Sequence, residues 1–325
     1  MASNSAAPRT LGKSVFQHFL SNNALVLVLY VLLGVAMIGL SLYSPTFRSS
    51  ANLWTLARQL VIPGIIGIAQ TMIILSGGID LSVASLVTFI SLVCSGFVDN
   101  DPQRFLPVAL LMLALGVAVG AFNGLLVTRG RVPPFIATLG TALLLQGSGL
   151  AYTTVPIGGI PQPIANLVYY GQLGTVPYPV IVLALIFVTM WFVLSRTSFG
   201  RNVYAVGGNA EVARRAGIPV NRTRMAVYCL GSFLVAIAAL IATTRMGIGD
   251  PLAGMGMELD SITAVVMGGT SLFGGRGSLF GTLAGVSILT VINNVMVMLN
   301  ISMWYQQLIK GLVVLLVVAI YKQRA

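Results

Sequence analysis

Apolar residues occur in long runs along this chain, and short polar stretches separate the runs. A membrane-spanning helix needs about 20 apolar residues, and most of the runs approach this length. The pattern predicts about ten spans, at 24–43, 59–76, 81–97, 107–128, 135–152, 178–195, 225–244, 259–269, 278–298 and 303–321. Because the eighth run is too short for a full crossing, it predicts a half-helix or a re-entrant segment.

Composition also indicates a bilayer environment. Hydrophobic residues make up 57% of the 325 positions and charged residues only 8%, too little polar surface for a water-soluble globule. We therefore expect an all-α, polytopic integral membrane protein. Its predicted parts are a cytoplasmic tail at 1–23 and a single transmembrane domain at 24–325, with a cytoplasmic loop at 196–224.

Basic residues set the expected orientation. If the N-terminus lies in the cytoplasm, 13 of the 18 Lys and Arg residues fall on that side. The positive-inside rule then predicts that both termini are cytoplasmic. This bias also accounts for the net charge of +11 without any nucleic-acid partner.

The loop at 196–224 contains six Arg and one Glu. Within it, the sequence NAEVARRAG predicts a short helix, because Asn209 can cap its N-terminus and Gly217 can close it. Glu211 lies in the first turn and Arg214 and Arg215 in the last, as the helix dipole favours. Such a helix spans only about 10 Å. We expect it to be a surface element that a cytoplasmic partner grips.

Several motifs resemble one family, in the order in which that family carries them. GRNVYAVGGNAEVARRAGI, which begins at Gly200, resembles the coupling-helix loop of the ribose/simple-sugar permease family of bacterial ATP-binding-cassette importers. SGGIDLSVAS at 76–85, RVPPFIATLGT at 131–141 and MELDSITAVVMGGTSLFGGRGSLFGTLAG at 257–285 are similar to further motifs. Ala84 differs, because the family usually has Gly there. The resemblance assigns ATPase coupling to Gly207, Gly208, Asn209, Ala210, Glu211, Ala213, Arg214, Arg215 and Gly217.

The resemblance implies a permease subunit that moves a ribose-like monosaccharide or similar small polar solute by alternating access across the bacterial inner membrane. ATP–Mg would be bound by two cytoplasmic ATPase subunits, so no cofactor is expected in this chain. A second permease subunit, identical or paralogous, would complete the path. A periplasmic or extracytoplasmic sugar-binding protein would deliver the solute. An ion-coupled secondary transporter or channel, an intramembrane enzyme, and a permease for branched-chain amino acids stay open as alternatives.

Polar side chains in or beside the spans are candidates for the path or its gate, because each is costly in hydrocarbon. They are Gln70, Thr71, Asp80, Ser82, Asn123, Gln146, Glu258, Asp260, Asn293, Asn294 and Lys310. For the uncharged ones, hydrogen bonding between helices is an equally open interpretation. Asp80 can instead cap the next helix through the amides of Ser82 and Val83. Lys310, about two turns into the last span, predicts an ion pair with Glu258 or Asp260.

The sequence offers little support for a catalytic, metal-binding or nucleotide-binding site. His18 is the only histidine, which excludes a Ser/His/Asp triad or a multi-histidine metal site within the chain, so no catalytic or metal residues are predicted. APRTLGKS at 7–14 fits a permissive phosphate-loop pattern, but no strand precedes it. SLFGGRGS at 271–278 is either an anion-binding nest or a tight turn.

A weak internal repeat is also visible. Asp80 in GGIDLS resembles Asp260 in MELDSI, and Asn123 resembles Asn293 and Asn294. The predicted topology puts Asp80 and Asn123 near the inner face, and Asp260 and Asn293 near the outer face. Spans two to five would then be inverted copies of spans seven to ten, as in many transporters. Chance similarity between apolar segments is the alternative.

Overall fold

The structure is a computed structural model that describes residues 15–322. Its longer helices, in chain order, are α1 (Val15–Tyr43), α2 (Ser50–Leu75), α3 (Ser82–Val98), α4 (Pro102–Thr128), α5 (Pro134–Tyr152), α7 (Tyr178–Arg196), α8 (Ser198–Gly208), α10 (Val220–Met246), α11 (Met257–Met267), α12 (Leu279–Met298) and α13 (Met303–Lys322). The shorter elements are α6 (Gln162–Ala165), the π-helix η1 (Asn166–Tyr170), the strands β1 (Gln172–Leu173) and β2 (Val176–Pro177), and α9 (Ala210–Arg215).

The predicted membrane architecture is confirmed. Each of the ten predicted spans coincides with a helix: α1 to α5, α7, and α10 to α13. Seven helices in the described part of the chain are long and apolar enough to cross a membrane, and α3, with 17 residues, is a shorter apolar helix. The eighth span, α11, has only 11 residues, as expected of a half-helix. The chain is therefore an all-α, multi-pass membrane protein.

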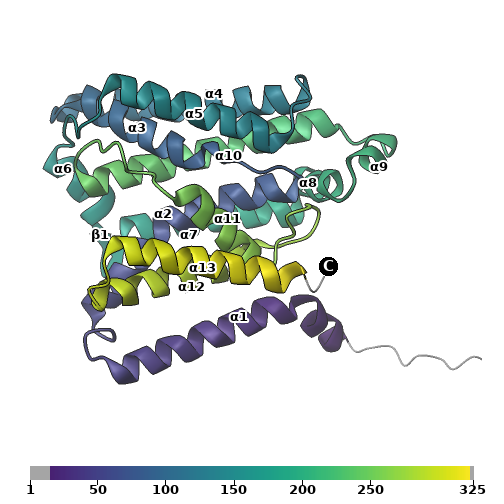
Figure 1. The fold of residues 1–325 in the computed structure, drawn as a ribbon, viewed down its shortest axis with the longest axis horizontal. Coiled ribbons are helices and arrows are strands. Elements are labelled where there is room, and N and C mark those ends of the chain that lie inside the picture. The colour runs from purple at the N-terminus through teal and green to yellow at the C-terminus, as the bar shows by residue number, and fades with distance from the viewer. Residues whose placement is uncertain (1–14, 323–325) are drawn as a thin grey trace, which may run out of the picture.

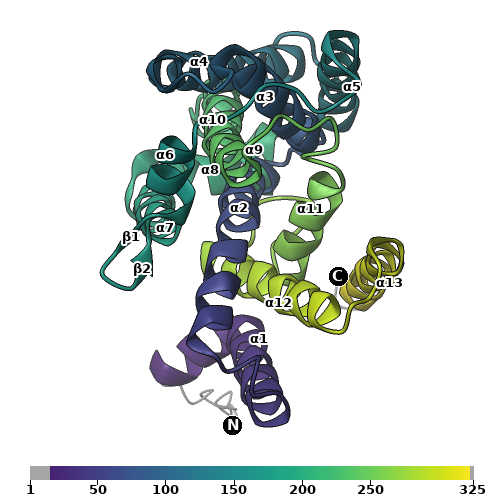
Figure 2. The same ribbon diagram turned by 90° about the vertical axis from the view of Figure 1, so that its left-hand side faces the viewer.

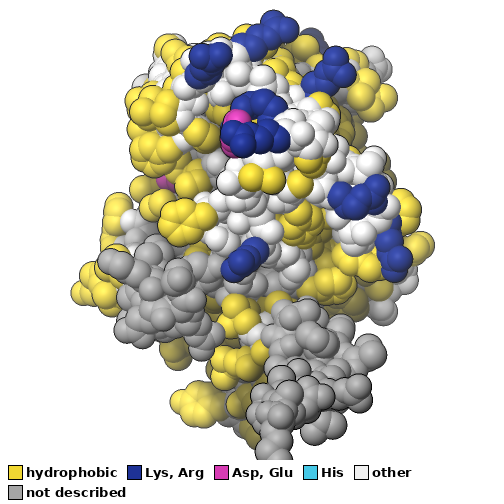
Figure 3. All heavy atoms as spheres, turned by 90° about the vertical axis from the view of Figure 1, so that its right-hand side faces the viewer, with side chains coloured by type: hydrophobic (Ala, Val, Ile, Leu, Met, Phe, Trp, Pro, Cys, Tyr) yellow, Lys and Arg dark blue, Asp and Glu magenta, His cyan; other side chains and the backbone are white. Residues whose placement is uncertain are grey.

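The two ends of the bundle differ in character. One end, which we call the arginine face, carries α8, α9, the α4–α5 loop and the loop 268–278 (Figure 1). Figure 3 looks onto this end and shows Lys and Arg side chains distributed across it. The opposite end, which we call the hairpin face, carries α6, η1 and the β1–β2 hairpin (Figure 1). Charge is thus concentrated outside the apolar middle of the bundle.

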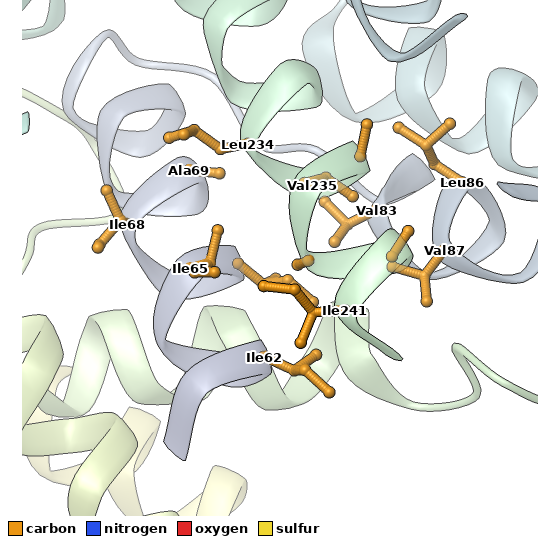
Figure 4. Close-up of a cluster of buried hydrophobic side chains, with 14 of the residues drawn as sticks. Ile62, Ile65, Ile68, Ala69, Val83, Leu86, Val87, Leu234, Val235 and Ile241 are labelled. Atoms are coloured by element: carbon orange, nitrogen blue, oxygen red, sulfur yellow. The ribbon is translucent and has the colours of Figure 1, made fainter. Parts of the chain in front are cut away.

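Helices α2 and α10 pack together at the centre of the bundle, as the view along the helix axes shows (Figure 2). Figure 4 shows Ile62, Ile65 and Ala69 of α2 facing a cluster that includes Val235 and Ile241 of α10. The two helices run in opposite directions, because Gly77, just after α2, lies beside Arg224 near the start of α10. Gly231 permits the close approach, since an added Cβ would lie 2.8 Å from Cδ1 of Ile73.

The packing contains the predicted inverted repeat. Exchanging α2 with α10, α3 with α11, α4 with α12, and α5 with α13 converts the contacts of one half into those of the other. Helix α4 packs on α10 as α12 packs on α2, α3 packs on α10 as α11 packs on α2, and α5 packs on α3 as α13 packs on α11. Each element also runs opposite to its counterpart along the bundle. This relation is that of two halves rotated about an axis in the membrane plane.

A stripe of glycines joins α4 to α10. Gly116, Gly120 and Gly124 recur at every fourth position, so they lie on one side of α4. A Cβ added at Gly120 would lie 2.4 Å from the carbonyl oxygen of Tyr228 and 2.7 Å from Cα of Cys229. The backbones of the two helices are therefore in direct contact, which is how membrane helices gain dispersion energy where lipid offers no hydrophobic drive.

Two regions have structure that the apolar pattern does not predict. Helix α8 occupies the first part of the polar loop. Thr197 caps it, because its hydroxyl accepts a hydrogen bond from Gly200 N at 3.2 Å. On the hairpin face, residues 153–177 pack over the ends of α3 and α10, with Ile157 and Gly249 exchanging two backbone hydrogen bonds. Residues 153–177 are interrupted by Pro and Gly and leave no periodic signal, whereas in α8 Phe199, Val203 and Val206 recur at helical spacing but the run is too short for a span.

The glycine stripe predicts a specific loss of stability. Gly120→Ala should lower the melting temperature of the purified permease, because overpacking costs about 1–3 kcal/mol whereas the gain in helix propensity is about 1 kcal/mol. Gly140→Ala in α5 is the matched control, since an added Cβ there meets nothing within 4 Å. Thermal unfolding in detergent measures both. Equal melting temperatures for the two variants would contradict the close contact.

Candidate functional site

Helix α9 forms as its caps predict. Asn209 Oδ1 accepts hydrogen bonds from the amides of Glu211 and Val212, both at 3.0 Å. The Glu211 carboxylate lies 3.1 Å from Arg214 Nη1 and 3.2 Å from Arg215 Nε. Gly217 follows the helix with φ of +80°, a conformation that favours glycine. The result is a short, capped and charged helix on the arginine face.

The orientation of α9 corrects one expectation. The sequence predicts that Ala210, Val212 and Ala213 together form a small face for a partner. Instead, Ala213 is buried and packs with Val206 of α8 and Val220 of α10 in a small apolar cluster. Val212 is 61% exposed and is the apolar side chain that α9 presents to the outside. Ala213 therefore holds α9 on the bundle, and Val212 remains exposed.

A glycine junction connects α8 to both halves of the repeat. Gly275 N donates a hydrogen bond to Leu75 O at 3.0 Å. A Cβ added at Gly207 would lie 1.7 Å from that same oxygen and 2.7 Å from Gly275 N. Three backbones, from the end of α8, the end of α2 and the loop 268–278, therefore meet without intervening side chains.

Tyr204 of α8 adds a fourth contact to this region, because its hydroxyl donates to Gly277 O at 3.1 Å. Movement of α8 must consequently displace both loops. The backbone of Gly208, the next residue, also approaches Gly275, but a Cβ added at Gly208 meets nothing within 4 Å. Of the two glycines in the coupling motif, Gly207 thus has the steric requirement.

Three of the candidate polar residues form a buried hydrogen-bond network near the arginine face. Asp80 Oδ1 accepts from the amide and the hydroxyl of Ser82, and Asn123 Nδ2 donates to the same hydroxyl at 3.0 Å. Thr141 Oγ1 donates to Asn123 Oδ1 at 2.6 Å. The bond expected from the Ser82 amide to Asp80 is therefore present, whereas no bond from the Val83 amide to Asp80 is found. The network ties α3, α4 and α5 together, which favours a structural role for Asp80, Ser82 and Asn123 over one in lining a path.

Two other candidates, Gln146 and Glu258, line one cavity. A cavity of about 460 Å³ lies between α3, α5 and the segment 251–259, and both Gln146 and Glu258 line it. Ser85 and Thr88 add hydroxyl groups to a wall that is otherwise largely apolar. Ala84, the position at which the motif differs from the family, is also part of this wall. The volume and the few convergent polar groups are typical of a small-molecule site.

The predicted ion pair is present and joins Lys310 to Asp260. Lys310 Nζ lies 2.7 Å from Asp260 Oδ2, and the two side chains are 28% and 33% exposed. Lys310 and Asn293 line a second cavity of about 270 Å³, together with Gln59, Arg245 and Gln306. The pair links α11 to α13 at the edge of a polar cavity. Glu258 is not part of it.

The depth of Asp260 is a further correction. The sequence places Glu258 and Asp260 near the outer face. In the structure, the segment before α11 turns back into the bundle, and Gly254 N donates to Thr88 Oγ1, near the middle of α3. Helix α11 therefore begins within the depth of the bundle. An acidic residue inside the bundle is also a feature of ion-coupled transporters, so Asp260 does not distinguish the two kinds of transporter.

The remaining polar candidates join helices. Thr71 and Thr282 hydroxyls lie 2.6 Å apart between α2 and α12. Asn294 Nδ2 donates to Asn52 Oδ1 at 3.3 Å between the same two helices. Gln70 is completely buried, and neither of its amide atoms has a hydrogen-bond partner among the described residues. Thr71 and Asn294 are thus part of the packing, whereas Gln70 keeps its status as a candidate.

The glycine-rich stretch at 271–278 is a tight turn. Ser271 N donates to Arg276 O, Gly274 N donates to Ser271 O, and Gly275 N is bonded to Leu75 O. These amides therefore point to backbone oxygens, which favours the turn over an anion-binding nest. The phosphate-loop pattern at 7–14 lies outside the described residues.

Sequence reasoning did not single out several residues that the geometry brings together. Tyr228 and Arg224 lie beside Gly78 and Gly77 respectively, close to Asp80. Thr138 Oγ1 accepts from Leu81 N and so fixes the start of α5 against the segment before α3. Thr138 belongs to the RVPPFIATLGT motif, so the motif could have pointed to it. A lone Tyr or Arg near the end of a span is common in membrane proteins and does not point to a site.

Comparisons with known proteins agree with this architecture. A family model described as "Branched-chain amino acid transport system / permease component" matches residues 52–318. The ribose import permease protein of Bacillus subtilis (strain 168) is 39% identical over 293 residues, covering 90% of this chain and 91% of that protein. The fructose import permease protein of Rhizobium meliloti is 36% identical over 331 residues, 98% and 91% of the two chains.

The autoinducer 2 import system permease protein of Enterobacter sp. (strain 638) is 36% identical over 274 residues, 84% of this chain and 79% of that protein. No solved structure matches the chain. These similarities extend over nearly the whole chain and confirm the resemblance found in its motifs. The chain belongs to the family of membrane-spanning permease components of import systems to which the ribose and fructose permeases belong.

Proposed function

We propose that this chain is the transmembrane subunit of an ATP-binding-cassette importer that carries a simple sugar, such as a ribose-like monosaccharide, into the cytoplasm. The observation that supports this most is the similarity to ribose and fructose import permeases over almost the whole chain. The cavity beside Ser85, Thr88 and Gln146 offers hydrogen-bonding groups that a hydroxyl-rich solute needs and can leave again.

In this proposal, the arginine face lies in the cytoplasm of a bacterium and the membrane is the inner membrane. The positive-inside rule supports this orientation, because the described Arg residues of the 196–224 loop all lie at this end. Two ATPase subunits bind ATP–Mg and dock at α9, so the permease has no ATPase site of its own. A sugar-binding protein docks on the hairpin face, and a second permease subunit completes the path.

The proposed coupling runs through the glycine junction. Closure of the ATPases moves α9, and α9 is packed on α8 through Val206 and Ala213. The end of α8 touches both the end of α2 and the loop 268–278. These two connections lead to α3 and to α11, and α3 and the segment entering α11 are two walls of the 460 Å³ cavity. Docking can therefore change access to the cavity from both halves of the repeat.

The test is transport by the reconstituted complex. Proteoliposomes that contain the permease, its ATPase and its binding protein should take up labelled ribose or another monosaccharide only when ATP is present on the ATPase side. Uptake that survives ATP depletion but stops with an ionophore would establish an ion-coupled transporter instead. The description of the family model names branched-chain amino acid transport, so labelled leucine is the second solute to test. Uptake of leucine in place of sugar would overturn the sugar assignment.

The exposed side chain of α9 predicts a docking defect. Val212→Asp puts a carboxylate where an apolar contact is proposed, so ATP-driven uptake should fall at least tenfold while the permease stays folded. Leu173→Asp is the matched control for copurification of the ATPase, because Leu173 is 68% exposed on the hairpin face, away from α9. Copurification of the ATPase with each variant measures docking directly. Normal copurification and uptake with Val212→Asp would refute docking at α9.

The glycine junction predicts uncoupling without loss of docking. Gly207→Ala forces backbone apart at Leu75 O, whereas Gly208→Ala meets nothing within 4 Å. We expect Gly207→Ala to retain the ATPase but to lose most of the ATP hydrolysis that the binding protein stimulates. Gly208→Ala should behave as the parent protein. Equal activities of the two neighbouring variants would show that the junction does not transmit movement.

The ion pair predicts rescue by a second substitution. Lys310→Met leaves the Asp260 carboxylate partly buried and unpaired, which costs about 3–5 kcal/mol where burial is complete and less at this exposure. The yield of the Lys310→Met variant in the membrane, or its uptake of solute, should therefore fall. Adding Asp260→Asn to the same chain should partly restore the yield or the uptake. Glu258→Gln is the control that should not rescue. A harmless Lys310→Met would mean that the pair contributes nothing.

A further inference from the structure

Four arginines from three elements surround one hollow on the arginine face. Arg129 and Arg131 come from the α4–α5 loop, Arg214 from α9 and Arg224 from the first turns of α10. The hollow has a volume of about 750 Å³, and Thr128 and Asn221 add further polar groups to its wall. Arg129, Arg131 and Arg214 are exposed, and Arg224 is half-buried. Arginine side chains present several donors each and suit phosphate oxygens.

The charges of this hollow are not balanced within the chain. Glu211 is the acidic residue nearest to it in sequence, and its two carboxylate oxygens are engaged by Arg214 and Arg215. Among the described residues, no salt bridge involves Arg129, Arg131 or Arg224. Like charges gathered in one concavity repel one another and focus a positive field there. An anion would relieve this repulsion.

The loop that carries Arg129 and Arg131 has a fixed shape. Gly130 N donates to Leu125 O and Val132 N donates to Leu126 O, which fold the loop back on the end of α4. Arg131 adopts φ of +53°, a backbone conformation that is uncommon for a residue other than glycine. Pro133 and Pro134 each have a fixed φ and restrict the residue before them. The backbone positions of the two arginines are therefore fixed before any ligand arrives.

The neighbouring surface indicates what kind of anion fits. Leu125, Phe135 and Ile136 are 45%, 52% and 58% exposed and lie on the two spans that lead away from the hollow. Charged groups thus stand at the end of the bundle, and exposed apolar side chains follow within a few residues along α4 and α5. A phospholipid has this same division, with a phosphate at the membrane surface and acyl chains below it. An acidic protein segment would leave the apolar side chains uncovered.

We propose that this hollow binds the phosphate of an anionic phospholipid. The lipid phosphate accepts hydrogen bonds from Arg129 and Arg131, and its acyl chains lie along Leu125, Phe135 and Ile136. Because Arg214 of α9 and Arg224 of α10 line the same hollow, the lipid joins the α4–α5 loop to the coupling element. The composition of the membrane would then tune the position of α9.

The experiment compares two double variants of the full-length permease with the same net charge. Arg129→Gln with Arg131→Gln removes two arginines of the hollow, and Arg201→Gln with Arg222→Gln removes two exposed arginines elsewhere on the same face. Binding of phosphatidylglycerol and of phosphatidylcholine is measured by native mass spectrometry from mixed detergent micelles. We expect the hollow variant to bind phosphatidylglycerol about 30-fold more weakly, as loss of two contacting charges implies. The control should bind as the parent protein.

Three outcomes would overturn the proposal. Equal losses in both double variants would mean that the attraction comes from the whole face and not from the hollow. Displacement of the lipid by millimolar inorganic phosphate, with phosphate itself bound, would assign the hollow to a free anion. Unchanged lipid binding in the hollow variant, together with lost copurification of the ATPase, would assign the hollow to protein docking.

Discussion

The antiparallel contact between α2 and α10 is the constraint on which the other helices depend. Lipid is as apolar as leucine, so these helices are held by close packing, and Gly231 admits Ile73 for that reason. Each of the two central helices then serves as the platform for the other half: α4 and α3 pack on α10, and α12 and α11 pack on α2. Because protein surrounds this region, the irregular segment 247–256 can end, and α11 can begin, inside the bundle with their backbone groups satisfied.

The same principle of contact without side chains governs the arginine face. At the glycine junction, the backbones of α8, the end of α2 and the loop 268–278 touch directly, and Gly207 would collide with Leu75 O if it carried a Cβ. Side chains absorb small shifts by changing rotamers, whereas backbones in contact cannot. A displacement of α8 therefore has to reappear in both halves of the repeat. This is the property that a coupling element needs.

The sequence was sufficient for the spans, the caps of α9, the Lys310 pair and the repeat, because each depends on local pattern or on charge near one membrane face. It was insufficient where a distant partner decides. The inward orientation of Ala213 depends on its contacts with Val206 in α8 and Val220 in α10, which the sequence of α9 does not reveal. The depth of Asp260 depends on Gly254 bonding to Thr88, a contact between positions 166 residues apart. Hydrophobicity alone carries no information about either.

The two halves of the repeat are copies in architecture but not in chemistry. At the start of α3, Asp80 is fully buried and bonded to Ser82, in a network that Asn123 and Thr141 extend to α4 and α5. At the start of the equivalent helix α11, Asp260 is one-third exposed and pairs with Lys310, which lines a cavity. The first arrangement has its hydrogen bonds satisfied within the protein and resists change. The second is partly exposed at the edge of a cavity, so it does not have the enclosed hydrogen bonding of the first.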